Sequence, residues 1–309
     1  MNGNIHHLDF AGYSIKFSPF HRDIFAVASA QHYGIVGNGK LVIGKFGNPQ
    51  PLAQVLTKEA CFDTAFSEEA ESLVTACTGS GEILFYDFSK QKVISSLPHA
   101  HTSEIGSLDF NCVKRELLVS AGWDSTVKVW DVNRLQAGNV STFNHHTGHV
   151  YQAACSPHDP RLIASVGSDG QLIITDTSQP YNIPLRMQHG SEVLSCDWHK
   201  YSPGLIATGS VDSLIRVWDI RNSSVPVSVL AGHTLAVRRV KCHPHIPNEI
   251  VSCSYDMTLR HWDLSIRKQI NCYNHHTEFA VGLDISLFEK DQVASTGWDR
   301  KTFIFSLFR

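Results

Sequence analysis

Several features that mark common protein classes are missing from this 309-residue sequence. It contains no run of eighteen apolar residues, so no membrane-spanning helix is expected. Residues 1–10 lack the apolar stretch of a secretory signal. Basic residues are not in excess, because the formal net charge is −3, and this disfavours a protein that binds nucleic acid through its phosphates. The apolar content of 42% and charged content of 18% indicate a folded globular chain.

A structural zinc site is disfavoured as well, because no CxxC pair is present. The best local histidine pairs, His146 with His149 and His243 with His245, lack an HExxH pattern and an acidic partner, so no metal is expected. Four of the eight cysteines recur in short apolar runs 41 to 46 residues apart: Cys112, Cys155, Cys196 and Cys242. We expect them to be buried core residues of a protein in a reducing compartment, not disulfide partners.

What the sequence does contain is an internal repeat. The pattern apolar–x–apolar–Trp–Asp recurs with stronger and weaker copies, 43 to 45 residues apart. Its seven copies end at Gly44, Asp87, Asp131, Asp176, Asp219, Asp263 and Ser306. A period of this length with four short strands per unit predicts an all-β, seven-bladed propeller that uses residues 1–309 as a single domain.

Polar residues recur at constant offsets inside five of the repeats. An aspartate stands seven positions before the end of each: Asp124, Asp169, Asp212, Asp256 and Asp299. A histidine stands 23 positions before each aspartate: His101, His146, His189, His233 and His276. A hydroxyl residue stands four positions before each aspartate: Ser120, Ser165, Thr208, Ser252 and Ser295. One Ser–His–Asp set would suggest a hydrolase, but five sets indicate a structural role, so no enzyme is predicted.

These offsets resemble the WD-repeat family over nearly the whole chain. In that family the histidine, hydroxyl, aspartate and tryptophan of one blade form a hydrogen-bonded tetrad. The resemblance implies three complete tetrads: His101, Ser120, Asp124 and Trp130; His189, Thr208, Asp212 and Trp218; His233, Ser252, Asp256 and Trp262. Thr175 and Phe305 replace the tryptophan in the fourth and seventh repeats, which leaves those tetrads incomplete.

The two ends of the chain are predicted to close the ring. The last repeat stops at residues 303–306, which form the third strand of its blade, and the segment from Asn4 to Phe10 can supply the fourth. This pairing would remove an exposed sheet edge. The first repeat departs from the pattern, because it lacks the histidine and the turn aspartate and has a long turn over residues 29–39.

Three positions in each repeat are expected to face outward on the narrow side of the propeller: the residue before the turn aspartate, and those three and five after the histidine. The candidate peptide-binding residues at these positions are Trp123, Tyr255, Trp298, Glu104, Glu192, Tyr151, Leu194, Arg238 and Phe279, with Phe62 at an equivalent place in the second repeat. A surface with several aromatic side chains and two acids favours peptide binding.

Loop segments point to one family. The distinctive stretches lie at residues 30–35, 194–198, 232–234, 238–241, 252–256 and 275–279. Together they resemble the import receptors for type-2 peroxisomal targeting signals, the peroxin-7 family. The resemblance implies a cofactor-free receptor that binds N-terminal peptides of cargo enzymes in the cytoplasm. It also implies delivery with a co-receptor (an isoform of the type-1 signal receptor or a fungal-type peroxin), contact with peroxisomal docking proteins, and shuttling to the peroxisome matrix.

The expected ligand carries a basic residue, an aliphatic one, five variable positions, then His or Gln and a small aliphatic residue. On a helix, the first and eighth positions point within about 20° of one another. We expect Glu104 and Glu192 to receive the two polar side chains, with Asp63 as the next candidate acid. The competing class is a substrate receptor of a cullin-4 ubiquitin ligase, because residues 218–221 match the WDxR motif of such receptors.

Overall fold

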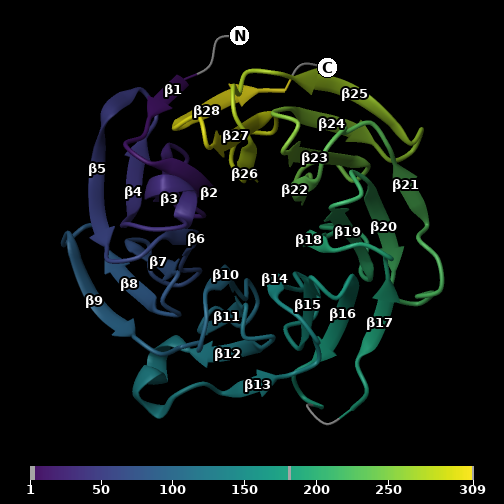
Figure 1. Ribbon diagram of the computed structural model, residues 1–309, viewed down its shortest axis with the longest axis horizontal. Helices are drawn as coiled ribbons and strands as arrows, with labels where there is room; N and C mark the ends of the chain where they lie inside the picture. The colour runs from purple at the N-terminus through teal and green to yellow at the C-terminus, as the bar shows by residue number, and fades with distance from the viewer. Residues whose placement is uncertain (1–3, 180–181, 308–309) are drawn as a thin grey trace.

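The computed structural model describes residues 4–179 and 182–307. Seven four-stranded sheets stand as blades around one central axis, and the first strand of each repeat is the innermost (Figure 1). Blades one to three contain β2 (Ala11–Phe17), β3 (Ile24–Ala30), β4 (Gly39–Lys45), β5 (Asn48–Thr57); β6 (Cys61–Phe66), β7 (Leu73–Thr78), β8 (Ile83–Asp87), β9 (Lys92–Leu97); and β10 (Ile105–Phe110), β11 (Leu117–Gly122), β12 (Val127–Asp131), β13 (Ser141–Phe143).

Blades four to seven follow the same order. They contain β14 (Val150–Cys155), β15 (Leu162–Gly167), β16 (Gln171–Asp176), β17 (Leu185–Gln188); β18 (Val193–Trp198), β19 (Leu205–Ser210), β20 (Ile215–Asp219), β21 (Ser228–Leu230); β22 (Val237–Cys242), β23 (Glu249–Ser254), β24 (Leu259–Asp263), β25 (Lys268–Tyr273); and β26 (Ala280–Ile285), β27 (Gln292–Gly297), β28 (Lys301–Ser306) with β1 (Asn4–His7). Short 3-10 helices, η1 (Gln31–Gly34) and η2 (Val132–Ala137), lie in loops. The predicted seven-bladed all-β propeller is confirmed.

Blade seven is completed by the N-terminal strand, as predicted. Strand β1 pairs antiparallel with β28, and Asn4 lies opposite Ile304 while His7 lies opposite Lys301. The strand ends at His7, before the predicted limit of Phe10, although Leu8 still donates a backbone hydrogen bond to Arg300. The outer edge of β28 is therefore covered by the other end of the chain.

The core lies between the blades and inside each sheet. Inner strands are buried along almost their whole length, as the pattern of β18 shows, because neighbouring blades cover both of their faces. Cys155, Cys196 and Cys242 are buried as predicted, and burial raises the pKa of each thiol. The prediction was wrong for Cys112, which is exposed, because β10 ends at Phe110 and Cys112 lies in the turn beyond it.

In blade three a chain of hydrogen bonds joins four side chains. Trp130 Nε1 donates to Ser120 Oγ at 2.9 Å, and Ser120 Oγ lies 2.7 Å from His101 Nε2. On the other side of the ring, His101 Nδ1 lies 2.9 Å from Asp124 Oδ1. Since a carboxylate only accepts, Nδ1 carries the proton and Nε2 accepts the hydroxyl proton. Burial lowers the pKa of His101, which favours the neutral ring that this chain requires.

Blade six contains the same chain with the same geometry. Trp262 Nε1 donates to Ser252 Oγ, and Ser252 Oγ lies beside His233 Nε2. On the other side of the ring, His233 Nδ1 lies beside Asp256 Oδ2, and each of the three distances is 2.8 Å. Both carboxylates also accept a backbone hydrogen bond beside their histidine, from Thr102 and from Thr234. These aspartates therefore hold the loop before the inner strand against the turn between the second and third strands.

Blade five differs from the predicted tetrad. His189 Nε2 lies 2.9 Å from Thr208 Oγ1, and Trp218 Nε1 lies 3.0 Å from the same nitrogen, but His189 Nδ1 has no hydrogen-bond partner in the described part of the chain. Asp212 instead accepts from Arg216 Nη2 at 2.7 Å and from Ser210. The guanidinium draws the carboxylate away, so the inclusion of Asp212 in this tetrad was wrong.

Blades four and seven lack the tryptophan but keep the remaining bonds. His146 Nδ1 lies 2.9 Å from Asp169 Oδ2, and its Nε2 lies 2.9 Å from Ser165 Oγ. In blade seven His276 Nδ1 lies 3.0 Å from Asp299 Oδ2, and its Nε2 lies 2.9 Å from Ser295 Oγ. In blade seven a second histidine takes the place of the indole. His275 Nε2 lies 3.1 Å from Ser295 Oγ, and its ring lies 4.9 Å from that of Phe305.

Candidate functional site

Every inner strand has a bulge at the same place. The register shifts between the flanking residues, so one residue in each blade is turned out of the ladder. We call these seven residues the inner ring: Tyr13, Phe62, Gly106, Tyr151, Leu194, Arg238 and Val281. Four of them are sequence-predicted site residues, namely Phe62, Tyr151, Leu194 and Arg238. The bulge explains why the position five after the histidine faces one end of the propeller.

A second set of positions is held beside this ring by a repeated backbone hydrogen bond. In six blades the residue before the turn aspartate position donates its backbone N–H to a carbonyl in the loop before the inner strand. The acceptor is the residue three positions after the histidine position, and the distances are 2.8 to 3.1 Å. The donor and acceptor pairs are Gly79 and Ala60, Trp123 and Glu104, Ser168 and His149, Val211 and Glu192, Tyr255 and Ala236, and Trp298 and Phe279. The remaining predicted residues therefore lie on the same face as the inner ring.

Aromatic side chains on this face contact one another in an unbroken series. We call the series the aromatic crescent, and it contains Tyr255, Phe279, Trp298, Tyr33, Tyr13, Phe62, Trp123, His149 and Tyr151. Ring centroids are 4.7 Å apart for Tyr255 and Phe279, 5.0 Å for Phe279 and Trp298, and 5.1 Å for Trp123 and His149. The crescent runs from blade six through blades seven, one, two and three to blade four.

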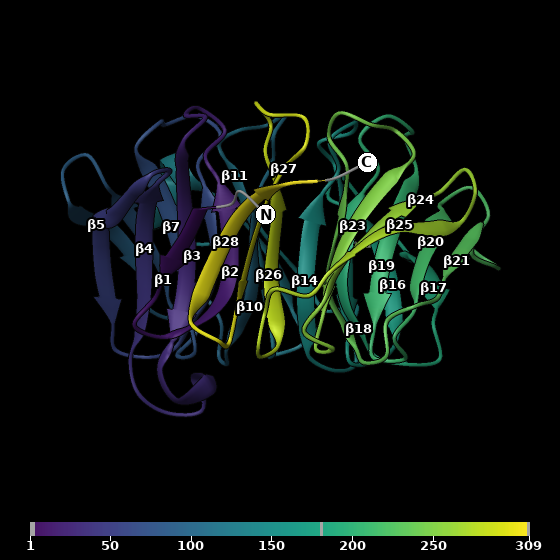
Figure 2. The ribbon, with the colours of Figure 1, turned by 90° about the horizontal axis from the view of Figure 1, so that it is seen from above.

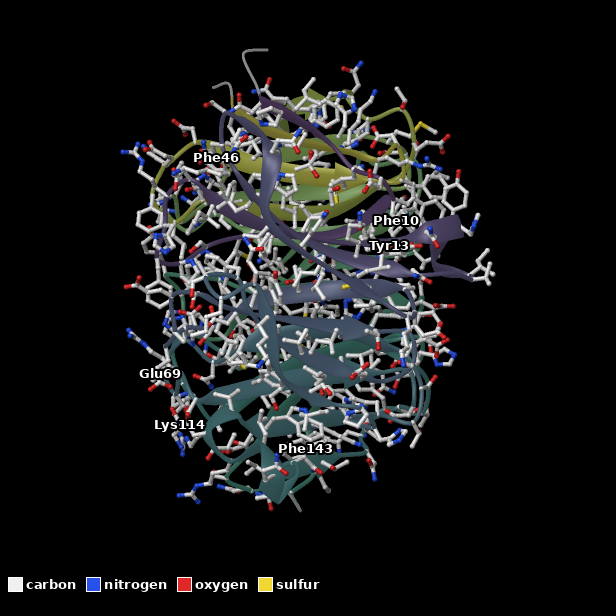
Figure 3. The ribbon with its side chains drawn as sticks, turned by 90° about the vertical axis from the view of Figure 1, so that its left-hand side faces the viewer. Phe10, Tyr13, Phe46, Glu69, Lys114 and Phe143 are labelled. Carbon is white, nitrogen blue, oxygen red and sulfur yellow. The ribbon has the colours of Figure 1, made fainter. Side chains whose placement is uncertain are left out.

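Blade one contributes two aromatic residues that the sequence analysis missed. Tyr13 is the inner-ring residue of β2, and its hydroxyl donates to the Tyr33 carbonyl at 2.5 Å. Tyr33 lies in the loop with η1, which extends beyond the other loops on this side (Figure 2), and its ring lies 5.0 Å from Trp298. The first repeat lacks the histidine from which the other positions were counted, so no offset pointed to Tyr13. Figure 3 places Tyr13 near one face and Glu69 and Lys114 at the opposite face.

Gly106 is the one inner-ring position without a side chain. A Cβ atom there would lie 2.8 Å from the Tyr151 carbonyl and 3.3 Å from Trp123 Nε1. The glycine thus leaves room for the Trp123 indole to lie over the strand, where the ring contacts Phe62 on one side and Tyr151 on the other. Trp123 therefore connects the crescent across blade three.

The predicted acids lie at the rim of the face, next to blade-three and blade-five turns. Glu192 is exposed and accepts a hydrogen bond from the Tyr151 hydroxyl at 2.8 Å. Glu104 is half-buried and accepts from the Ser103 hydroxyl. Asp63, the alternative acid, is fully buried. It accepts from the Leu108 N–H at 3.0 Å and lies 3.6 Å from Arg239 Nη2, so it joins blades rather than facing solvent.

Burial sets the protonation of the tyrosines in the site. It raises the pKa of Tyr13 and of Tyr151, and in Tyr151 the hydrogen bond to Glu192 adds to the effect. Both hydroxyls are therefore neutral donors at physiological pH. Leu194 is the most buried of the predicted contact residues, with 8% of its surface exposed. Its side chain contributes to the floor of the face more than to its accessible surface.

The WDxR residues are engaged within the fold. Trp218 donates its indole N–H to His189 and Thr208, and Arg221 pairs with Asp219 at 2.5 Å. Arg161 and Asp159 make a similar pair in blade four, at 2.7 Å. The motif thus coincides with a buried tetrad residue and an ion pair at the end of a strand.

The opposite end of the propeller has a cavity of about 410 Å³. Its polar wall includes Lys16, Asp109 and the ion pairs of Lys200 with Asp197 and Lys241 with Asp284. Asp109 also accepts from the Cys155 N–H at 2.8 Å. Across residues 4–179 and 182–307 no group of three metal-binding side chains occurs, and no helix there is long and apolar enough to cross a membrane.

Comparison with known proteins agrees with the geometry. The family described as "WD domain, G-beta repeat" matches residues 91–131, and the family described as "EIPR1 beta-propeller" matches residues 133–262. Together with the seven blades and the tetrads, these matches define the class of the protein, a WD-repeat β-propeller.

Relatives identify the family within this class. The chain is 39% identical to the peroxisomal targeting signal 2 receptor of Mus musculus, over 95% of this chain and 93% of that protein. It is 31% identical to the receptor of the same name from Saccharomyces cerevisiae, over 97% of this chain and 98% of that protein. It is 39% identical to peroxisome biogenesis protein 7 of Arabidopsis thaliana, over 96% of this chain and 95% of that protein. The chain belongs to the family of peroxisomal targeting signal 2 receptors.

Proposed function

We propose that this chain binds N-terminal type-2 peroxisomal targeting peptides of matrix enzymes on the face formed by the inner ring and the aromatic crescent. The names of the relatives support this ligand. The observation that carries the proposal is the arrangement of contacting aromatic side chains beside two carboxylates, Glu104 and Glu192. Apolar anchors of a helical peptide can pack on the rings while its basic side chains approach the acids.

The remaining steps of the pathway are part of the same proposal. The receptor binds its cargo in the cytoplasm, acts with a co-receptor, contacts docking proteins at the peroxisome, and shuttles between the cytoplasm and the matrix. It performs these steps as a binding protein without a cofactor. The membership of the chain in the receptor family supports this role.

Titration of a fluorescent helical peptide with the type-2 pattern tests the binding step, with and without a co-receptor. The Trp123→Ala variant should bind the peptide about thirtyfold more weakly or worse, because an aromatic anchor near the centre of an interface is typically worth about 2 kcal/mol or more. Phe288→Ala is the matched control, since Phe288 is exposed in the loop between β26 and β27, at the opposite end from the crescent. Equal affinity of both variants and the wild type would contradict the assignment of this face.

A further inference from the structure

Arg238 differs from every other member of the inner ring, because it alone is charged. It is the bulged residue of β22, between Val237 and Arg239, and its half-buried side chain belongs to the inner ring of the proposed peptide site. Its positive charge partly offsets the burial that raises the pKa of Tyr13 and of Tyr151, the inner-ring tyrosines of blades one and four. Arg238 occupies the same bulge position in its blade as these two tyrosines do in theirs.

This guanidinium has no acidic partner within the described residues. Arg238 Nη1 is enclosed without a hydrogen-bond acceptor, and no carboxylate of residues 4–179 and 182–307 lies within ion-pair distance of the side chain. Two acids of neighbouring inner strands and loops have other partners. Glu192 accepts from Tyr151, and Asp63 accepts from the Leu108 N–H and lies beside Arg239.

A ligand that covers the face must compensate this charge. An arginine that loses its water without gaining a charged or hydrogen-bonded partner destabilises the complex. A carboxylate matches the guanidinium best, because its two oxygens can accept two parallel N–H groups. The face then has opposite charges at separate places, with acids on the rims of blades three and five and a base in the inner ring of blade six.

We propose that Arg238 binds an acidic side chain of the docked peptide. The proposal rests on the proposed function and adds to it the chemistry of one variable position of the ligand. The bound segment is a helix that presents basic residues to Glu104 and Glu192 and one carboxylate to Arg238. A single charge pattern on the ligand thereby fixes its rotation and direction on the face.

A glutamate scan tests this assignment. The parent is a fluorescent helical peptide of the type-2 pattern with alanine at all five variable positions, and each position is changed to glutamate in turn. We expect glutamate at one position to tighten binding to the wild type by about tenfold, the range of a charge-assisted hydrogen bond. The same change should give no gain with Arg238→Gln and a partial gain with Arg238→Lys.

Arg161→Gln serves as the control, since Arg161 is exposed, is paired with Asp159, and lies in the loop that joins β14 to β15. It should respond to the scan as the wild type does. If the parent peptide binds but no glutamate discriminates the wild type from Arg238→Gln by more than about twofold, the carboxylate assignment is wrong and the proposed function stands. If the parent peptide fails to bind the wild type with co-receptor present, the proposed function itself fails.

Discussion

The hydroxyl of Tyr151 donates a hydrogen bond to Glu192 at 2.8 Å and so joins the inner ring of blade four to the rim of blade five. The bond orients the carboxylate, and burial together with this bond keeps the donating tyrosine in its neutral form. Glu192 is exposed, so an incoming cation can still approach it. A held but accessible acid of this kind requires little reorganisation when a basic ligand binds.

Glu104→Gln and Glu192→Gln should each weaken binding of a type-2 peptide by about 10- to 150-fold, because each removes a partly desolvated charge-assisted contact of roughly 1.5–3 kcal/mol. Thermal melting should stay near that of the wild type. The difference from the wild type should shrink at high salt, since the contact is screened. Peptide titration at two salt concentrations measures both effects.

Glu69→Gln provides a matched control for these two variants, because Glu69 is exposed at the opposite face (Figure 3). Its affinity for the peptide should equal that of the wild type. Wild-type affinity in both Glu104→Gln and Glu192→Gln would instead show that the basic residues of the ligand bind elsewhere.

Asp256→Ala should destabilise the protein more than Asp212→Ala. Removal of Asp256 leaves the buried His233 Nδ1 without its acceptor, which costs about 1–3 kcal/mol in the free energy of unfolding. Asp212 makes no such bond in blade five, and without it Arg216 can still donate to the Ser210 hydroxyl. Urea unfolding of the two variants measures the difference, and an equal loss for both would contradict the assignment of the two turns.

Deletion of residues 1–10 should expose the outer edge of β28 and promote self-association. Strand β1 pairs with β28 over four residues, and the ring of His6 packs against that of Phe25 at 4.9 Å. Light scattering and thermal melting report the expected aggregation and loss of stability. A synthetic peptide of residues 1–10, added in excess, should reverse part of the change. A deletion variant that remains monomeric with an unchanged melting midpoint would refute this role for β1.

The protein should lose stability on acidification below pH 6.5. Burial lowers the pKa of His189 to about 4, with a smaller contribution from the positive charge of Arg216, and burial lowers that of His275 to about 3. In each case the folded state favours the neutral ring. This stability is therefore complete above the unfolded pKa of about 6.5 and is lost as the pH falls through 4 and 3.

The variant His275→Gln isolates one part of this effect. Glutamine can still donate to Ser295 but does not titrate, so the variant should lose less stability than the wild type between pH 7 and pH 4. Urea unfolding at several pH values gives the two curves. Parallel curves would show that His275 does not contribute to the acid sensitivity.

Much of the fold followed from spacing alone. The constant spacing between His101, Asp124 and their counterparts reflects a histidine–aspartate hydrogen bond that recurs in blades three, four, six and seven. The spacing therefore located the loop before the inner strand and the turn between the second and third strands. The same counting found Tyr151 and Arg238, because the bulge occurs at a fixed place in each inner strand. Tyr13 was missed because its repeat has no histidine from which to count.

Other features depended on contacts that spacing does not encode. Asp212 has the same position in its repeat as Asp256. In blade five, however, the aspartate pairs with Arg216 rather than with the histidine, and this pairing is visible only in the packed structure. Asp63 looked like a free acid near the face, yet it is buried beside Arg239 of a distant blade. Residue type and offset do not distinguish such cases, because the deciding partner lies on another repeat.

The pairing of β1 with β28 also has a consequence for the order of events during synthesis. Among the described strands of the propeller, β1 leaves the ribosome first and β28 last, so blade seven combines the earliest strand with the three latest. Six blades can form while the chain is still growing, but the ring stays open until β28 is released. During that interval the edge of β1 is free, and a chaperone that shields it would protect the nascent chain from pairing with its neighbours.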